Sequence, residues 1–378
     1  MYLERLALTD FRSYTDAEFG PAPSGITVVT GPNGAGKTNL IEAVAYLATL
    51  RSLRAAPPAA LVRAGAEPQM AILRSVIRHR ETGRRIDVDA ELHAAGRDRV
   101  KVNGQPLRRT RDLLGALQVT VFSPDDLALV KGSPAGRRDY LDDLMVALQP
   151  RRDDLLTELD RVLKQRNALL KSVFSTGWRP GRPLPEDVRI TLDVWDSKLS
   201  AVGESLVTAR NSLAVELAPF VASAYSALAA GSATPDRSSV TLSYQVSWAG
   251  SLAEAVSAAR DDDLRRGVTT VGPQRDDLLL SIGGLPARTH ASQGEQRTLA
   301  LALRLAGHHL LAAAIGSAPV LLLDDVFSEL DSARAEALMA NMPALSDTQA
   351  ILTTAGDLPP GAPQPGARFR VEDGKILP

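Results

Sequence analysis

The sequence predicts an α/β protein that combines a mixed β-sheet and an antiparallel subdomain with an inserted, mainly helical lobe. Residues 26–30 form a β-branched run that ends at a glycine, and a helical pattern follows at 37–50. Apolar and charged side chains alternate over 86–92, as in an antiparallel strand with one solvated face. Most of 127–266 has the spacing of apolar residues that is typical of helices.

We expect two domains, one of which interrupts the other. The 378 residues are enough for two or three domains of ~150 residues each. Strand-like sequence returns after the helical region, so the first domain would comprise residues 1–126 and 268–378. The helical lobe would occupy 127–267, with loops rich in glycine, proline or serine at 178–185 and 231–239.

Further strands and one long helix are predicted from short apolar runs and from turn residues. The segment Val102-Asn103-Gly104 is typical of a hairpin turn. A helical pattern at 293–314 lies between two apolar runs. The remaining predicted strands are 2–8, 240–247, 278–282, 319–323 and 348–353.

Composition narrows the functional class. The 43 basic and 44 acidic residues give a net charge of −1, so any surface that binds a polyanion must be local. The absence of cysteine excludes disulfides and thiol chemistry, and the five histidines lack metal-ligand spacing. We identify neither a signal peptide nor an apolar run of about 20 residues. The expectation is a cytoplasmic protein without a membrane partner.

The most specific motif runs from Gly31 to Thr38 and fits the P-loop pattern G-x-x-x-x-G-K-[ST]. Glycines let backbone N–H groups surround a phosphate without steric clash, and the N-terminus of the following helix attracts the same anion. Lys37 would bridge the β- and γ-phosphates of ATP, and Thr38 would bind Mg²⁺. The predicted nucleotide-binding residues of this loop are Gly31, Pro32, Asn33, Gly34, Ala35, Gly36, Lys37 and Thr38.

Two adjacent carboxylates, Asp324 and Asp325, follow the apolar run 320–323. Such a run predicts a buried central strand, and the carboxyl ends of strands are where α/β sheets bind ligands. Asp324 would hold Mg²⁺, and Asp325 would orient or deprotonate the attacking water. The pattern is common by itself and gains its meaning from the P-loop.

The predicted helix at 293–314 begins with a segment that has two interpretations. Ser292 and Glu295 have the spacing of a capping box, which is a purely structural feature. A serine-capped helix start that contains Gly294 is also suited to binding an anion.

In their order along the chain, these motifs resemble those of ABC-type P-loop ATPases. That resemblance implies an ABC-type ATPase head with ATP and Mg²⁺ as cofactors. It implies a nucleotide-binding signature sequence formed by Ser292, Gly294 and Glu295. It also implies a D-loop at Ser328 and Asp331 that touches a partner subunit. Thr353 stands at the position of a catalytic switch residue that is often histidine.

Smaller phrases resemble the RecF family of bacterial recombination-repair ATPases and span nearly the whole chain. The segment 10–14 is similar to that family's N-F-R-N-Y, which implies that Arg12 lies near the nucleotide. Ser52-Leu53-Arg54 matches its S-x-R phrase loosely. The segment 272–277 is similar to its G-P-H-R-D-D, with Gln274 where the family usually has histidine. The other matching phrases are 38–43, 102–104, 112–115, 122–127, 131–134 and Arg137-Arg138.

The RecF resemblance implies slow ATP hydrolysis coupled to dimerisation on double-stranded or gapped DNA. The implied protein partners are RecR and, through it, RecO, in placing RecA at gaps. One alternative is an SMC-like ATPase head, but the insert at 127–266 is too short and too broken for long coiled-coil arms. Another is a transporter's ATP-binding subunit, which would carry L-S-G-G-Q where this chain departs at Gln293 and Glu295.

A local excess of basic residues suggests a surface that contacts DNA. From Arg51 to Arg111 the sequence has 14 basic and 6 acidic residues. Arg97, Arg99 and Lys101 would share one face of a strand by the two-residue period, where they could contact phosphates without reading bases. A solvated sheet face without a binding role is an equal alternative.

Overall fold

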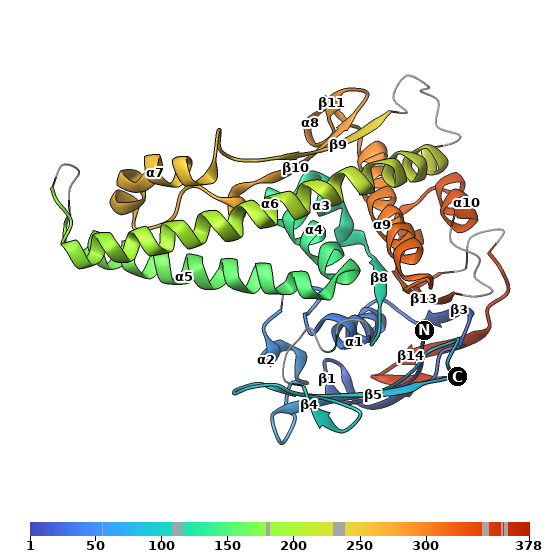
Figure 1. The fold of residues 1–378 in the computed structure, drawn as a ribbon. Coiled ribbons are helices and arrows are strands. Elements are labelled where there is room, and N and C mark those ends of the chain that lie inside the picture. The colour runs from blue at the N-terminus through green and yellow to red at the C-terminus, as the bar shows by residue number, and fades with distance from the viewer. Residues whose placement is uncertain are drawn as a thin grey trace. The chain divides into compact units, whose positions relative to one another are not determined.

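Two structural units make up the chain, and both are discontinuous in sequence (Figure 1). The head unit comprises Met1–Leu127, Phe220–Ser238 and Gln293–Pro378. The helical unit comprises Ala128–Pro219 and Ser239–Ser292. The computed structural model describes residues 1–54, 56–107, 113, 116–178, 182–229, 239–341, 348–356, 358 and 362–378. Parts of the predicted loops (179–181 and 231–238) and of the family-like phrase (112, 114 and 115) lie outside the described residues.

The unit boundaries differ from the prediction in two places. Residues 268–292, expected in the head, belong to the helical unit. The reason is that strand β10 (Asp277–Ile282) pairs antiparallel with β9 (Val240–Gln245) of the same unit. The second difference lies within helix α6 (Glu186–Ala229), which is divided after Pro219, a residue that removes one backbone N–H from the helix.

The described part of the head unit contains two six-stranded sheets. One is antiparallel, with the order β2-β1-β4-β5-β6-β7, and the other is mixed, with the order β15-β14-β3-β13-β12-β8. The strands are β1 (Tyr2–Phe11), β2 (Tyr14–Phe19), β3 (Gly25–Thr30), β4 (Met70–Arg78), β5 (Arg85–His93), β6 (Arg99–Val102), β7 (Gln105–Pro106), β8 (Val119–Phe122), β12 (Val320–Asp324), β13 (Gln349–Thr354), β14 (Ala367–Glu372) and β15 (Lys375–Leu377). The helices are α1 (Lys37–Thr49), α2 (Pro58–Leu61), η2 (Pro124–Asp126), α9 (Gln293–Ile315), η6 (Val326–Glu329) and α10 (Ser332–Asn341).

Helix α1 packs against strands of both sheets. Its Leu40, Ile41, Val44 and Leu47 are fully buried, and ten of its 13 residues are buried. A helix that is apolar on nearly all sides must be enclosed, and α1 belongs to one continuous core with strands of the two sheets. This packing holds the loop before α1 in a defined position on the sheet.

The central strands of the mixed sheet explain the continuous apolar runs in the sequence. Every residue of β12 and of β13 is buried, and the two strands pair in parallel. Parallel strands are covered on both faces, so their sequences do not alternate between apolar and polar residues. The fold class predicted from the sequence is therefore confirmed, including the antiparallel subdomain.

A buried amide connects the two sheets. Gln349, on β13, is only 1% exposed. Its Oε1 accepts from the backbone N of Leu3 at 2.8 Å, and its Nε2 donates to the carbonyl oxygens of Leu3 and Ala22 at 2.8 Å. The side chain thereby satisfies backbone groups of β1 that would otherwise be buried without partners.

The helical unit contains a small antiparallel sheet and a set of helices. The remaining elements of this unit are α3 (Leu127–Lys131), α4 (Pro134–Leu148), η3 (Pro150–Arg152), α5 (Asp153–Ser175), α7 (Leu252–Arg266), η5 (Pro273–Arg275), β11 (Leu285–Pro286) and α8 (Ala287–His290). Leucine and valine side chains of α5, α6 and α7 share one apolar cluster, so these three helices pack on each other.

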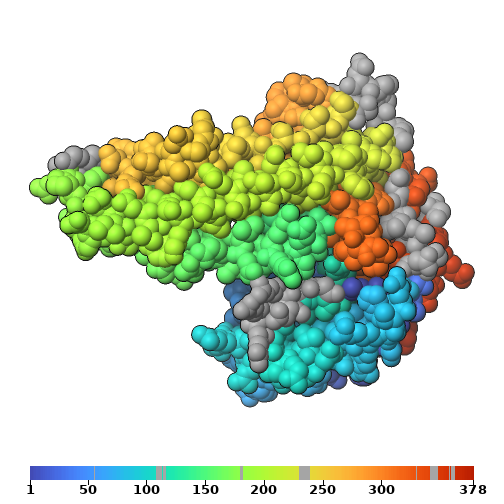
Figure 2. Space-filling model, viewed as in Figure 1, coloured from blue at the N-terminus to red at the C-terminus, as the bar shows by residue number. Residues whose placement is uncertain are grey.

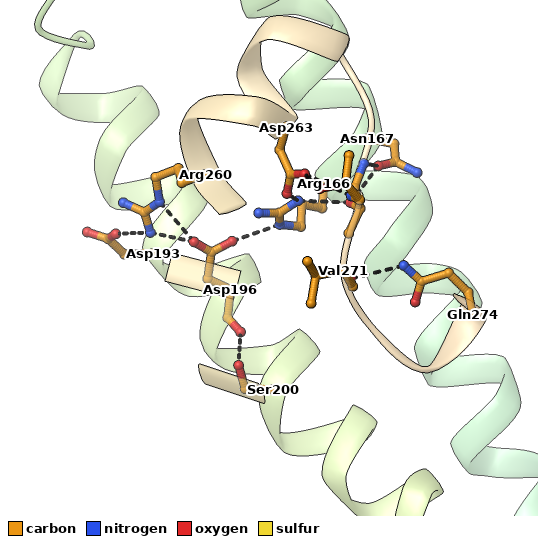
Figure 3. A network of polar contacts seen from close by, with 11 residues as sticks. Arg166, Asn167, Asp193, Asp196, Ser200, Arg260, Asp263, Val271 and Gln274 are labelled. Atoms are coloured by element: carbon orange, nitrogen blue, oxygen red, sulfur yellow. Dashed lines mark hydrogen bonds and ion pairs between the residues drawn. The ribbon is translucent and has the colours of Figure 1, made fainter. Parts of the chain in front are cut away.

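A buried arginine joins α5, α6 and the segment around the end of α7 (Figure 3). Arg166 is fully buried, and its Nε donates to Asp196 Oδ1 at 2.7 Å. Its Nη1 donates to Asp263 Oδ2 at 2.6 Å and to Thr269 Oγ1 at 2.9 Å. Arg260 also pairs with Asp196, at 3.0 Å from Nε to Oδ2. Two guanidinium groups therefore neutralise carboxylates that would be costly to bury alone.

Two of the family-like phrases meet within the helical unit. Arg137 forms a bidentate pair with Asp277, with distances of 2.7 and 2.8 Å. Arg138 Nη1 donates to the carbonyl oxygen of Asp276 at 2.6 Å. Gln274, in the same segment, donates through Nε2 to the carbonyl oxygen of Val271 at 3.1 Å. The segments 131–138 and 272–277 are thus joined by an ion pair and a hydrogen bond. The side chain of Gln274 makes a hydrogen bond within its own segment.

The expectation that the sequence has no long apolar run is wrong for two helices. Helices α6 and α9 each contain an 18-residue window with a mean hydropathy of 1.4. Of these windows, 39% and 67% respectively are buried inside the protein. Length and composition alone would allow either helix to cross a membrane, but core helices of soluble proteins meet the same criterion.

Candidate nucleotide-binding site

The P-loop connects β3 to α1, and its Gly31 and Gly36 are closely surrounded. A Cβ atom at Gly31 would lie 2.5 Å from the carbonyl oxygen of Val371, on β14. A Cβ atom at Gly36, whose φ is 116°, would lie 2.6 Å from Ser13 Oγ. Only glycine fits at these two positions, so the packing of the loop supports the reason given for the motif.

Lys37 is directed back into the loop. Its Nζ donates to the carbonyl oxygens of Gly31 at 2.7 Å and Pro32 at 3.0 Å, and the residue is 7% exposed. The cation is therefore held where the backbone curls around it. Such a position suits a group that meets the phosphates of a nucleotide.

The P-loop and the predicted aspartate pair are brought together at the ends of β3 and β12, the two strands that flank β13 in the mixed sheet. Thr38 Oγ1 donates to Asp324 Oδ1 at 3.0 Å, and Thr353 Oγ1 donates to the same oxygen at 2.7 Å. Burial raises the pKa of the Asp324 carboxyl above its ordinary value, and these hydrogen bonds and the charge of Arg54 offset only part of that rise. Three segments that are far apart in sequence thus converge on one carboxylate.

Thr353, on β13, is buried next to the aspartate pair. It is fully buried, and its Oγ1 accepts from the backbone N of Asp325 at 3.1 Å while donating to Asp324. At the predicted switch position, Thr353 therefore makes hydrogen bonds to the side chain of Asp324 and to the backbone of Asp325. Asp325 itself has the left-handed backbone angles φ 48° and ψ 30°, a strained conformation for a residue other than glycine.

Arg54 is a site residue for which the sequence motifs predicted no role. Its charge lowers the pKa of the Asp324 carboxyl and so opposes part of the effect of burial. Its backbone N donates to Ser52 Oγ at 3.2 Å, and Ser52 Oγ donates to Glu42 Oε1 at 2.6 Å. The signal in the sequence was the S-x-R phrase, which is only a loose match to the family pattern.

Arg12, in the turn between β1 and β2, is anchored to α1. Its Nε and Nη2 donate to the two carboxylate oxygens of Glu42 at 2.8 and 3.0 Å. Glu42 is 1% exposed, so this pair is shielded from water on one side. Arg12 also lines a hollow together with Ser13 and Asn39, which follows the P-loop. A second hollow is lined by residues 32–35 of the P-loop itself.

The predicted signature and D-loop residues surround the start of α9. Ser292 is exposed directly before the helix, and Glu295 is half-buried in its first turn. Gly294 lies against α10, because a Cβ atom there would be 2.9 Å from Arg334 Nη2. In the D-loop, Ser328 Oγ donates to the carbonyl oxygen of Asp325 at 2.8 Å. Asp331 is paired with Arg334.

The three predicted DNA-contacting residues are exposed, and two of them lie opposite carboxylates. Arg99 and Lys101 share the exposed face of β6, whereas Arg97 precedes the strand. In the pairing with β5, Glu91 lies opposite Arg99 and Asp89 lies opposite Lys101. The strands β4 to β6 form part of the light-blue and cyan surface in Figure 2. The basic charge on this face is therefore partly neutralised.

The P-loop before α1, the aspartate pair at the end of β12 and the second anion-suited helix start define the head of an ABC-type P-loop ATPase. A family model described as the RecF/RecN/SMC N-terminal domain matches residues 2–357. The DNA replication and repair protein RecF of Acidothermus cellulolyticus is 43% identical over 385 residues, which cover 100% of this chain and 99% of that protein. The RecF of Streptomyces avermitilis is 43% identical over 386 residues, with the same coverage. The chain belongs to the RecF family.

Solved structures agree with this assignment. A structure described as the recombination mediator protein RecF with bound ATPrS has a TM-score of 0.85 and is 27% identical, covering 100% of this chain and 97% of the other. An SMC head domain derived from Pyrococcus furiosus has a TM-score of 0.55 at 16% identity, covering 100% and 95% of the two chains, which shows the fold alone. The family expected from the sequence is confirmed, and the SMC and transporter alternatives are not favoured.

Proposed function

We propose that this chain binds ATP with Mg²⁺, pairs with a second copy in the ATP-bound state, and separates after slow hydrolysis during DNA replication and repair. The observation that carries the proposal is the convergence of Thr38, from the P-loop, and Thr353, from β13, on the carboxylate of Asp324. Relatives that match the full chain are named for DNA replication and repair, which supports the biological setting.

The oxygen atoms at this point suit a magnesium ion. A hydroxyl of Thr38 and a carboxylate oxygen of Asp324 lie 3.0 Å apart, and Mg²⁺ prefers such oxygen ligands. Thr38 and Asp324 would hold the ion, which when bound neutralises charge on the phosphates. Thr353 keeps the carboxylate oriented toward that position through its own hydrogen bond.

Other residues of the chain would bind the phosphates and the nucleoside, activate the attacking water and complete the site of a partner subunit. Lys37 would contact the β- and γ-phosphates from within the loop, and the hollow lined by Arg12 and Asn39 would accept the nucleoside. Asp325, one residue beyond the magnesium ligand, would orient or deprotonate the attacking water. Ser292, Gly294 and Glu295 would complete the site of a partner subunit, which makes pairing dependent on ATP.

The proposed partners are double-stranded or gapped DNA, RecR with RecO and RecA, and a second copy of the chain, in the cytoplasm. The similar solved RecF with bound ATPrS is described as a recombination mediator in the RecFOR pathway, which supports RecR and RecO as partners here. Arg97, Arg99 and Lys101 remain candidates for phosphate contacts. Carboxylates on β5 lie opposite Arg99 and Lys101 of β6. We therefore expect the exposed face of β6 to contribute only part of the DNA affinity.

Separate replacement of the two aspartates tests the proposed function. Asp324→Asn should weaken magnesium-dependent ATP binding, because it removes the charge that holds the ion. Asp325→Asn should bind ATP normally but hydrolyse it about 100-fold more slowly, and should therefore accumulate as the ATP-bound pair. Nucleotide affinity and turnover are measured on the full-length chain with and without double-stranded DNA. Equal loss of ATP binding in both variants would contradict this division of roles.

Replacement of Arg54 tests a site residue to which the sequence motifs assigned no role. Arg54→Ala should slow hydrolysis about 10-fold, less than the ~100-fold expected for a buried donor, because Arg54 is exposed. Arg54→Lys keeps the charge and should retain most of the rate. The measurement is turnover at saturating ATP, with ATP affinity determined in parallel. An Arg54→Ala variant with the wild-type rate excludes a role for this cation in turnover.

A further inference from the structure

Arg334 lies where the D-loop, helix α10 and helix α9 meet within the head unit. Its backbone N donates to Asp331 Oδ1 at 2.9 Å, and its Nη1 forms an ion pair with the same carboxylate. Its Nε donates to Thr298 Oγ1, on α9, at 3.1 Å. The guanidinium is therefore fixed from the D-loop on one side and from α9 on the other, and the side chain is 27% exposed.

Thr298 also makes a hydrogen bond to the first turn of α9. The residue is 2% exposed, and its Oγ1 donates to the carbonyl oxygen of Gly294 at 2.9 Å. A hydroxyl can donate one hydrogen bond and accept another, and Thr298 does both here. The position of the guanidinium is thus linked to the backbone of the turn that carries the signature residues.

Gly294 provides the space that this arrangement needs. A Cβ atom at this position would lie 2.9 Å from Arg334 Nη2. Glycine weakens a helix relative to alanine, so its presence in the first turn calls for a local reason. The sequence relates Gly294 to nucleotide binding, and the structure shows a second use, because the guanidinium lies directly on the turn.

We propose that Arg334 is a positioning residue that couples the D-loop to the start of α9. Through it, Asp331 and the signature residues form one connected surface for the partner subunit. A shift of Asp331 on contact with the partner would move the guanidinium and, through Thr298, the first turn of α9. This inference rests on the proposed ATP-dependent pairing and adds the residue that would hold the two partner-facing segments together.

The test compares pairing with nucleotide binding in the full-length chain. Arg334→Ala should leave ATP affinity at the P-loop unchanged but weaken pairing about 10-fold. Pairing is measured by sedimentation with a slowly hydrolysed ATP analogue. Thr298→Val, which has the same shape but no hydroxyl, should have a similar effect. The double variant should be no weaker than either single variant, because all three interrupt one linkage.

A matched control separates this linkage from general loss of an ion pair. Arg161 pairs with Glu158 three residues before it, as Arg334 does with Asp331, but on the exposed surface of α5. Arg161→Ala should pair normally, and the thermal unfolding midpoint of Arg334→Ala should match that of this control. The inference would be overturned if Arg334→Ala paired as strongly as the wild type. It would also be overturned if the losses of pairing in the two single variants multiplied in the double variant. Either result would leave the proposed function intact. A wild-type chain that fails to pair with the analogue would overturn both.

Discussion

A chain carrying Lys37→Met, mixed with a chain carrying Ser292→Arg, is expected to recover the ATP-dependent pairing that neither variant shows alone. Lys37 is the cation inside the P-loop, and Ser292 is exposed directly before α9. If the two groups meet across a symmetric pair, each variant alone has two defective sites. A mixed pair has both defects in one site and leaves the other intact. Each variant alone should lose turnover about 100-fold or more.

Sedimentation of the mixture with a slowly hydrolysed ATP analogue is the better measurement, since turnover can require two intact sites. Lys37→Met should also show lost ATP affinity, whereas Ser292→Arg should bind ATP as a single chain with normal affinity. Circular dichroism of both variants checks that they remain folded. If Ser292→Arg alone pairs and hydrolyses ATP normally, Ser292 is only a helix cap, and a site shared between two chains is excluded.

Arg166→Met is expected to lower the free energy of unfolding of the helical unit by about 3–5 kcal/mol, because it leaves buried carboxylates without their charge partner. Arg166 is fully buried, and it donates to Asp196 and Asp263 at 2.7 and 2.6 Å. Methionine fills a similar volume but donates no hydrogen bond. The three tryptophans of the chain all belong to the helical unit: Trp178, Trp195 and Trp248. Their fluorescence during urea unfolding therefore reports on this unit.

The control for this experiment lies on the same helix. Arg161→Met removes an exposed ion pair with Glu158, and should change the free energy of unfolding by less than about 1 kcal/mol. Adding Asp196→Asn and Asp263→Asn to Arg166→Met should restore part of the lost stability, because neutral side chains are less costly to bury. Unfolding of Arg166→Met at the wild-type urea concentration would show that the buried network contributes little.

Local patterns were sufficient for the elements that carry the chemistry. The strand before the P-loop, helix α1, helix α9 and strands β12 and β13 were predicted to within about two residues, because a buried parallel strand and a glycine-rich loop leave strong signals. Strands β8 and β14 were not predicted. β8 is a short strand at the edge of the mixed sheet, and β14 alternates between exposed and partly buried residues. Such segments become strands because a neighbouring strand pairs with them.

The sequence by itself determined the fold class, the phosphate-binding loop and the family, because each depends on residue types at fixed local spacing. Tertiary structure alone decided which distant groups meet. Thr353 contacts Asp324 from another strand, and Arg54 comes close enough to influence its pKa. The unit boundary at Ser292 likewise depends on the pairing of β9 with β10. Hydrogen bonds and charge interactions act over a few ångströms of space, and separation along the chain does not predict that distance.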